Sequence, residues 1–254
     1  MSAFDADIIV VGGGIHGVGV AQAAAAAGHG VLLLEKEDFA AGTSSRSSKL
    51  IHGGLRYLET AQINLVQESL AERRILLRIA PSLVRLVPFY IPVYRETSRR
   101  PWQIRIGLSL YALLGRLTET SRFGTLPRSE WDGLDGLRTA GLQTVFRYWD
   151  AQTDDELLTR AVARSAVALG ARVLLRSSFV SAVREDDGYR MTVETEGRRR
   201  ELRCRAVVNA AGPWANRVLD AVTPRPRKLD IDLVQGAHIV LGGSIREGVY
   251  YCEA

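Results

Sequence analysis

Six residues near the N-terminus have the types and the spacing that bind a dinucleotide. They read Gly12-Gly13-Gly14-Ile15-His16-Gly17, match G-x-G-x-x-G, and lie between an apolar stretch and an alanine-rich one. Gly12 allows the tight turn of this motif, Gly14 lets the backbone approach a pyrophosphate, and Gly17 lets a helix pack against a strand. The helix N-terminus then points N–H groups and partial positive charge at the phosphates. The motif predicts a dinucleotide site, the alternative being a glycine-rich turn without a ligand.

A carboxylate follows at a spacing that suits the ribose of a dinucleotide. Glu35 ends the next expected strand, 21 residues after Gly14. In dinucleotide-binding folds such a carboxylate accepts a hydrogen bond from a ribose hydroxyl, and it would repel a 2′-phosphate. The motif and Glu35 do not by themselves separate FAD from NAD.

Two further segments can contact a cofactor. Residues 43–49 read Thr-Ser-Ser-Arg-Ser-Ser-Lys, which offers many hydrogen-bond donors to a pyrophosphate and to a ring system. A serine-rich loop is also common without a ligand, so this segment alone favours neither dinucleotide. The strand expected at 206–210 leads into Ala211-Gly212-Pro213-Trp214, where small residues again let the backbone approach a cofactor.

The elements that must position these residues alternate between strand and helix. Apolar strands are expected at 7–11 and 31–34, with a helix at 15–27 between them. This order predicts a parallel sheet with helices on its faces. The remaining pattern predicts helices at 63–79, 102–117, 154–169 and 213–222, and strands at 172–175, 179–184, 189–195, 201–204, 206–210 and 237–241.

Composition places the chain among ordinary globular proteins. Of its 254 residues, 46% are hydrophobic and 24% charged, which excludes a disordered or fibrous protein. Cys204 and Cys252 have no ligand spacing, so we expect no metal site, no disulfide framework and a reducing compartment. The acidic N-terminal residues do not read as a secretory signal, and no run of about 18 uncharged apolar residues could span a bilayer.

Taken together, these segments resemble the FAD-dependent glycerol-3-phosphate dehydrogenases. The most specific string is Ser47-Ser48-Lys49-Leu50-Ile51-His52-Gly53-Gly54-Leu55-Arg56-Tyr57-Leu58-Glu59. Other matches follow in order at 9–17, 70–73, 104–108, 208–214 and 236–240, so the resemblance covers nearly the whole chain.

The resemblance implies an α/β flavoprotein of the amino-acid-oxidase type. A Rossmann-type FAD-binding domain, residues 1–80 and 150–222, would carry a mixed, partly antiparallel substrate or cap region, residues 81–149 and 223–254. Glycerol 3-phosphate would be oxidised at C2 to dihydroxyacetone phosphate. FAD would take the hydride, and the electrons would pass to quinone or, in some relatives, to oxygen.

The resemblance also implies a set of cofactor-binding residues. Val180 would contact the adenine end of FAD through its backbone. The full set is Gly12, Gly14, Ile15, His16, Gly17, Glu35, Lys36, Thr43, Ser44, Ser45, Ser48, Lys49, Leu50, Ile51, His52, Gly53, Val180, Ala211, Gly212 and Trp214.

Four residues are catalytic candidates. Arg56 offers a guanidinium fork for phosphate oxygens, and Tyr57 a hydroxyl that can orient a substrate oxygen. The alternative for these two is packing, with a salt bridge from Arg56 to Glu59. His52 is either a proton acceptor near the flavin or only a hydrogen-bonding partner of its ring. His238 lies on an expected apolar strand, where a core role competes with a site role, and the catalytic base stays unassigned.

Three features depart from the family pattern. Ala23 and Ala27 replace an Asp and an Arg of the first helix, and Gln235 replaces a lysine. Family members are also considerably longer, so we expect the C-terminal part of the cap region to be missing. A truncated, inactive flavin-binding fragment therefore stays open as an alternative. A related flavoprotein acting on amines, amino acids or 2-hydroxy acids is a second alternative, which the string from Ser47 to Glu59 disfavours.

The net charge of +5 is concentrated in residues 95–128, which hold seven arginines against two glutamates. Arginines and aromatic residues around Trp102 suit a helix that lies on anionic lipid, the alternatives being a solvated face and an internal helix. No recognition motif for nucleic acid accompanies the charge, so we expect no such partner. The expected location is cytoplasmic, peripheral on the inner face of the cell membrane. The oligomeric state, a homodimer included, stays open.

Overall fold

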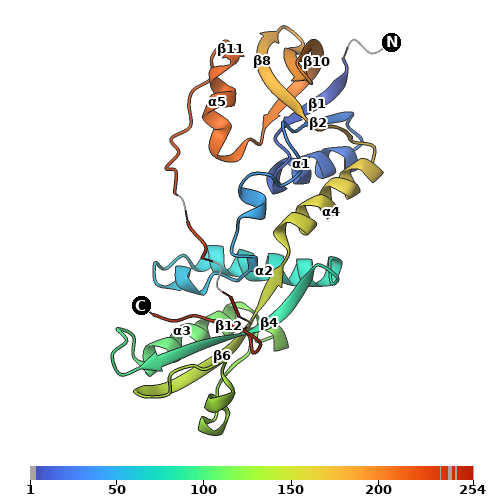
Figure 1. Ribbon diagram of the computed structural model, residues 1–254. Coiled ribbons are helices and arrows are strands. Elements are labelled where there is room, and N and C mark those ends of the chain that lie inside the picture. Colours follow the sequence, from blue (N-terminus) through green and yellow to red (C-terminus); the bar gives the residue numbers. More distant parts are fainter. Residues whose placement is uncertain (1–3, 235, 240–241, 244, 254) are drawn as a thin grey trace. The chain divides into compact units, whose positions relative to one another are not determined.

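The computed structural model describes residues 4–234, 236–239, 242–243 and 245–253. The chain divides into two compact units, one of residues 1–48 and 154–237, the other of residues 49–153 and 238–254 (Figure 1). The boundaries expected from the sequence differ from this division mainly in residues 49–80. That segment includes the helix α2 (Ile63–Ile79), which packs in the second unit.

The first unit is built on a seven-stranded sheet in the order β11-β8-β9-β10-β1-β2-β7. The four neighbouring strands β10, β1, β2 and β7 are parallel, whereas β8, β9 and β10 form an antiparallel meander. The strands are β1 (Ala6–Val11), β2 (Val31–Leu34), β7 (Arg172–Leu174), β8 (Ser177–Glu185), β9 (Gly188–Thr195), β10 (Arg198–Asn209) and β11 (Val222–Thr223).

Alternating side chains give the first unit two cores. Val10 and Leu33 pack against the helices α1 (Ile15–Ala26) and α4 (Asp155–Ala168), which lie side by side on one face (Figure 1). Ile9 and Leu32 belong to the opposite core, which the meander and α5 (Ala215–Asp220) complete. This arrangement confirms the expected α/β class, in a sheet whose strands β10, β1, β2 and β7 are parallel and whose remaining strands are partly antiparallel.

Three sequence expectations for this part of the chain are corrected. The strands expected at 201–204 and 206–210 are one strand, because β10 pairs with β9 along its first half and with β1 along its second. The helix expected at 213–222 begins as the 3₁₀ turn η5 (Gly212–Trp214) before α5. Of the strand expected at 237–241, residues 237–239 form no strand, and the other two lie outside the described residues.

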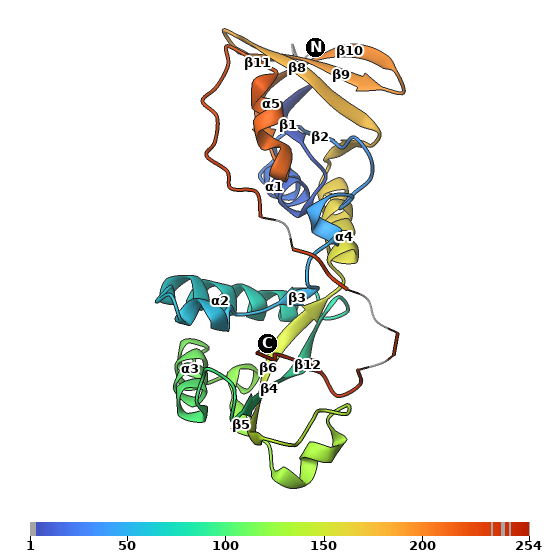
Figure 2. The ribbon, with the colours of Figure 1, turned by 60° about the vertical axis from the view of Figure 1, so that its left-hand side comes forward.

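The second unit is a mixed sheet in the order β12-β4-β6-β3, with β5 added beside β6 (Figure 2). Its long pair of strands, residues 84–94 and 142–153, was not among the strands expected from the sequence, and the first of them contains Pro88 and Pro92. The two prolines lie four residues apart, so by the two-residue period of a strand their missing N–H groups face one edge. The strands are β3 (Leu50–Ile51), β4 (Val84–Tyr94), β5 (Phe123–Thr125), β6 (Leu142–Thr153) and β12 (Val249–Tyr250).

Helices α2 and α3 (Pro101–Leu114) cover one face of the second sheet. Phe89, Phe146 and Tyr148 from the strands pack there against Leu70 and Tyr111 from the helices. The other face packs under the 3₁₀ segment η4 (Arg128–Gly133) and the residues around it. Two further 3₁₀ turns, η2 (Leu55–Leu58) and η3 (Glu119–Ser121), complete this unit.

Candidate functional site

The glycine-rich turn of the first unit leaves no room for side chains. Gly12 has φ +113°, and a Cβ there would lie 2.5 Å from the carbonyl oxygen of Ala210. A Cβ on Gly17 would overlap the carbonyl oxygen of Gly12. The turn therefore requires glycine at both positions, and it presents bare backbone at the carboxyl end of β1, where ligands bind in open α/β sheets.

The start of α1 is arranged to receive an anion. The backbone N–H of Ile15 donates to the hydroxyl of Ser44 at 2.9 Å, which brings the 3₁₀ turn η1 (Thr43–Ser45) against the helix. The next N–H groups, from His16 and Gly17, have no partner within the helix by its geometry. The first turn of the helix contains no acidic side chain, so no carboxylate of α1 itself offsets its partial positive charge.

Glu35 is held at the carboxyl end of β2, beside the glycine turn. Its Oε2 accepts from the N–H of Gly13 at 2.6 Å, and its Oε1 accepts from the N–H of Glu37 at 2.8 Å. Each carboxylate oxygen has a second lone pair, so Glu35 can still accept from a ribose hydroxyl. Glu35 therefore lies where its spacing of 21 residues from Gly14 predicted it, at the end of β2 and beside the glycine turn.

Val180 occupies an irregular point in β8. Phe179 pairs with Val193 and Ser181 with Thr192, so Val180 is an extra residue in the ladder. A bulged residue is left unpaired by the neighbouring strand, which makes its backbone groups available to a ligand. The start of β8 lies beside Glu35, because the N–H of Ser177 donates to the Glu35 carbonyl at 2.9 Å.

The segment after β10 is fixed by one side chain. The amide of Asn209 donates to the carbonyl of Ala215 at 2.9 Å and accepts from the N–H of Ala211 at 3.2 Å. The Trp214 that follows packs on the loop after β2. The ammonium of Lys36 lies 5.1 Å from the Trp214 ring centroid, and a Cβ on Gly42 would come within 3.0 Å of that ring.

The structure thus brings one half of the predicted cofactor set together. Strands β1, β2 and β10 run parallel and end at the same edge, because Val11 is in register with both Leu34 and Asn209. At this edge lie the glycine turn, Glu35, the serine turn and the segment 211–214. A glycine cradle, a helix N-terminus and a fixed carboxylate form the donor and acceptor set that FAD requires, so these residues fit that cofactor.

The other half of the set lies in the second unit. Lys49 has φ +61° and leads into β3, which pairs with β6 through Leu50 and Ile51. His52 follows, exposed, and its Nδ1 accepts from the N–H of Gly54 at 3.1 Å. Because Nδ1 is the acceptor, the neutral ring carries its proton on Nε2 and presents a donor outward.

Arg56 and Tyr57 are exposed on η2, immediately after this turn. The salt bridge considered between Arg56 and Glu59 is not formed, because Glu59 pairs with Arg99 at 2.9 Å instead. His238 lies in an irregular segment and is exposed, so its expected place on an apolar strand is wrong.

Sequence reasoning missed a buried polar cluster beneath the His52 turn. Arg73 from α2 and Asp150 from β6 form an ion pair at 2.6 Å, and both side chains are almost fully buried. Tyr111 from α3 donates to the same carboxylate at 2.9 Å. The match at 70–73 included Arg73, but a charged residue on a helix reads as solvent-exposed, so nothing in the sequence announced its burial.

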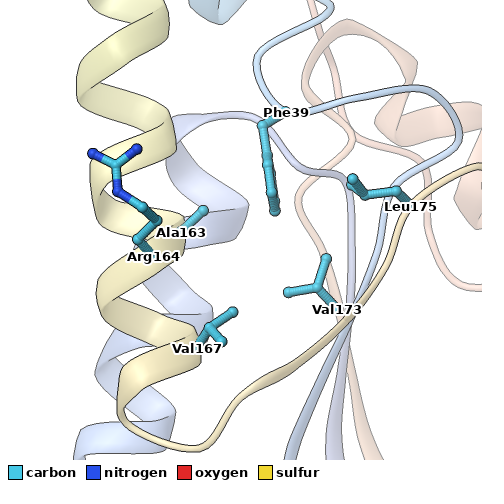
Figure 3. A pocket seen from close by; sticks show the side chains of 6 residues that line it. All are labelled: Phe39, Ala163, Arg164, Val167, Val173 and Leu175. Atoms are coloured by element: carbon cyan, nitrogen blue, oxygen red, sulfur yellow. The ribbon is translucent and has the colours of Figure 1, made fainter.

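A hollow of about 300 Å³ lies elsewhere in the first unit, between α4 and β7. Figure 3 shows Phe39 projecting between the helix and the strand. The lining is apolar apart from Arg164 and contains no residue of the predicted cofactor set; it comprises Phe39, Ala163, Arg164, Val167, Val173 and Leu175. We therefore place the candidate site at the carboxyl end of β1 and not here.

Comparison with known proteins agrees with this geometry. A sequence profile of FAD dependent oxidoreductases matches residues 7–250. The chain belongs to this family. The resemblance deduced from the sequence is confirmed, as is FAD as the cofactor of the family.

Two curated relatives of the chain are named as dehydrogenases of polyol phosphates. It is 41% identical over 239 residues to the aerobic glycerol-3-phosphate dehydrogenase of Escherichia coli (strain K12), covering 92% of this chain and 46% of that protein. It is also 41% identical over 242 residues to the D-erythritol 1-phosphate dehydrogenase of Brucella abortus (strain 2308), covering 92% of this chain and 47% of that protein. The chain spans about half the length of these relatives.

A solved structure shows the same fold. The glycerol-3-phosphate dehydrogenase from Bacillus halodurans, complexed with FAD, superposes on this chain with a TM-score of 0.63 and 27% sequence identity. The superposition covers 85% of this chain and 36% of that one.

Proposed function

We propose that this protein binds FAD and oxidises a small polyol phosphate, glycerol 3-phosphate first among the candidates. The observation that carries the proposal is the glycine cradle at the carboxyl end of β1, in a chain 41% identical to a glycerol-3-phosphate dehydrogenase. When bound, FAD supplies the hydride acceptor for oxidation at C2, and the product is dihydroxyacetone phosphate.

The first unit would hold the dinucleotide part of the cofactor. The N–H groups at the start of α1 would receive the pyrophosphate, and Glu35 would accept from the ribose. The unpaired backbone of Val180 would hydrogen-bond the adenine. The other proposed contacts of this unit are Gly12, Gly14, Ile15, His16, Gly17, Lys36, Thr43, Ser44, Ser45, Ser48, Ala211, Gly212 and Trp214.

The second unit would supply the residues for the reacting end. Lys49, Leu50, Ile51 and Gly53 would contact the cofactor through the backbone near β3. His52, with its proton on Nε2, would donate a hydrogen bond to an acceptor atom of the cofactor or substrate. The geometry of its Nδ1 supports this role over that of a proton acceptor.

The substrate phosphate requires a cation, and Arg56 offers one. Its partner in the salt-bridge alternative, Glu59, is engaged by Arg99, which leaves the exposed guanidinium of Arg56 suited to phosphate oxygens. Tyr57 would orient a substrate hydroxyl. His238 stays a candidate for the same region.

The identity of the polyol phosphate has a second candidate. The D-erythritol 1-phosphate dehydrogenase matches the chain as closely as the glycerol-3-phosphate enzyme does, at 41% identity. The two substrates share a phosphate and a neighbouring secondary alcohol, so the same cation and hydroxyl-orienting groups would serve both.

The surface of helix α3 supports the proposal that the electrons pass to quinone in a membrane. Its exposed Trp102, Ile106 and Leu113 fall on one side at helical spacing, with 62%, 59% and 61% of their surface exposed. Arg99 and Arg105 lie close by in the chain, a composition suited to an anionic lipid surface that holds quinone. Among the described residues, no helix has the length and apolar character to cross a bilayer. Oxygen is the alternative acceptor.

The deciding experiment is anaerobic. The protein is reconstituted with FAD, its visible spectrum is recorded, and glycerol 3-phosphate or D-erythritol 1-phosphate is added. Loss of the oxidised flavin band with either phosphate supports the proposal and selects the substrate. Bound flavin that neither phosphate reduces would overturn the substrate class, and absence of bound flavin would overturn the whole proposal.

A further inference from the structure

A buried ionic cluster lies directly beneath the turn that carries His52. Arg73 is 2% exposed and Asp150 is 1% exposed. The Nη1 of Arg73 donates to Asp150 at 2.6 Å and to the carbonyl of Trp149 at 3.1 Å, while its Nη2 donates to the carbonyl of Thr120 at 3.0 Å. The cluster thus joins α2, β6 and the segment after α3.

The cluster converges on one backbone group, the N–H of Gly53. That N–H donates to the hydroxyl of Tyr111 at 2.9 Å and to both oxygens of Asp150 at 3.2 Å. The Tyr111 hydroxyl in turn donates to Asp150 at 2.9 Å. A Cβ on Gly53 would overlap the Tyr111 hydroxyl and Leu70, so the backbone is seated directly on the cluster.

Fold stability alone is a weak reason for such a cluster. A buried ion pair loses much of its Coulombic gain to desolvation, and well-packed apolar residues often stabilise a core as well or better. What apolar residues cannot do is accept a hydrogen bond from Gly53. The cluster supplies acceptors at the one place where the chain turns from β3 towards η2.

Anchoring the backbone amide of Gly53 also restricts the position of the His52 ring. The N–H of Gly53 is bound by the Tyr111 hydroxyl, and the N–H of the next residue, Gly54, donates to His52 Nδ1. Gly54 has φ +74°, a conformation that its neighbour's anchoring helps to maintain. The position and the tautomer of the His52 ring therefore follow from hydrogen bonds that begin at Asp150 and Tyr111.

We propose that Arg73, Asp150 and Tyr111 are positioning residues that fix the turn carrying His52, Arg56 and Tyr57 for its work on the flavin and the substrate. None of the three needs to touch either molecule. The role of the turn in the reaction rests on the function proposed above, whereas the hold on Gly53 does not.

The sharpest variant is Tyr111→Phe. It removes one hydroxyl and keeps the ring, whereas Asp150→Asn would leave the buried Arg73 charge uncompensated and endanger folding. The matched control is Tyr148→Phe, the same chemical change in the same core. The Tyr148 ring packs edge-on against Tyr111, with centroids 6.0 Å apart.

Two measurements distinguish the hold of the cluster on the turn from the effect of the turn on the reaction. Amide hydrogen exchange at Gly53, in protein without cofactor, reports the hold on the turn. The rate of flavin reduction by substrate, and the visible spectrum of bound FAD, report its effect on the reaction. We expect Tyr111→Phe to speed Gly53 exchange by about tenfold, the scale of one lost hydrogen bond, and to slow flavin reduction by at least about as much. Tyr148→Phe should change neither.

Equal effects of the two variants on Gly53 exchange would overturn the proposal, whether or not flavin binds. Faster exchange in Tyr111→Phe with unchanged reduction rate and flavin spectrum would overturn the link to the reaction. Failure of the unmodified protein to bind FAD would instead contradict the proposed function, while the exchange result would still decide whether the cluster holds the turn.

Discussion

The hydroxyl of Ser44 accepts a hydrogen bond from the backbone N–H of Ile15 at 2.9 Å, across 29 positions of sequence. This bond ties the serine-rich loop to the first turn of α1. A helix starts with N–H groups that have no partner in the helix, and here one of them is satisfied by a distant side chain. The serine loop and the glycine turn therefore form one structure at the edge of the sheet.

Ser44→Ala should weaken FAD binding. The substitution removes the acceptor of the Ile15 N–H, and losing a helix-capping hydroxyl costs about 1 kcal/mol, or about fivefold in an equilibrium constant. Ser47→Ala is the control, since the Ser47 hydroxyl donates to Asp155 at 2.7 Å and not to α1. Titration of each variant with FAD, followed by flavin fluorescence, measures the effect. Equal dissociation constants for the two variants would contradict the assignment.

Gly17→Ala should destabilise the first unit although alanine is the better helix former. The new Cβ would overlap the carbonyl oxygen of Gly12, and such overpacking costs about 1–3 kcal/mol. Gly19→Ala, two residues on in the same helix, is the control. Nothing lies within 4 Å of its Cβ position, so it should gain about 0.5–1 kcal/mol from helix propensity. Opposite shifts in the urea midpoint would bear this out, and shifts of the same sign would not.

The parts of the site that could be predicted from the sequence are those whose cause is local. The glycine motif, the strand before it and the helix after it lie within a short stretch, and each glycine has a steric reason visible in the pattern. Strand β2 and Glu35 followed from the same spacing. The limits of α2 were also predicted, because apolar residues recur along it at helical spacing and Pro81 stands just beyond its end.

The parts that could not be predicted depend on pairing between distant residues. The antiparallel pair β4–β6 joins residues such as Phe89 and Tyr148, and no local signal announces that register. Arg73 and Asp150 are 77 positions apart, and they meet only when α2 packs on the sheet. The sequence suggested a salt bridge between Arg56 and Glu59. In the structure Glu59 pairs instead with Arg99, which lies 40 positions away.

The two roles considered for His52 predict different effects of substituting it. If Nε2 donates a hydrogen bond, as the bond from Gly54 to Nδ1 implies, His52→Gln should keep a donor and lose about tenfold or less in the rate of flavin reduction. His52→Ala should lose more. A general base contributes about 100- to 10,000-fold, and neither variant could replace it. Stopped-flow reduction by glycerol 3-phosphate separates the two, since equally large losses would support a proton acceptor.

Asp135 should make the attachment of residues 246–250 depend on pH. The N–H of Arg246 and then that of Glu247 donate to its carboxylate, each at 3.0 Å, and these bonds hold the pKa of Asp135 below its ordinary value. Because the folded-state pKa is depressed, the contribution to stability is present above the ordinary aspartate pKa of about 3.9 and is lost as the pH falls through the folded-state pKa.

Asp135→Asn tests this dependence without disturbing the backbone, because asparagine also tolerates the φ of +45° at this position. At neutral pH the variant should exchange the amide hydrogens of Arg246 and Glu247 faster than the unmodified protein does, since a neutral amide is a weaker acceptor than a carboxylate. The difference should shrink only as the pH falls below the ordinary aspartate pKa of about 3.9 and through the lowered folded-state pKa, where the carboxylate of the unmodified protein becomes protonated. Asp132→Asn, an exposed carboxylate nearby, should leave both amides unchanged. A difference that persists unaltered at low pH would show that the charge of Asp135 is not what holds the segment.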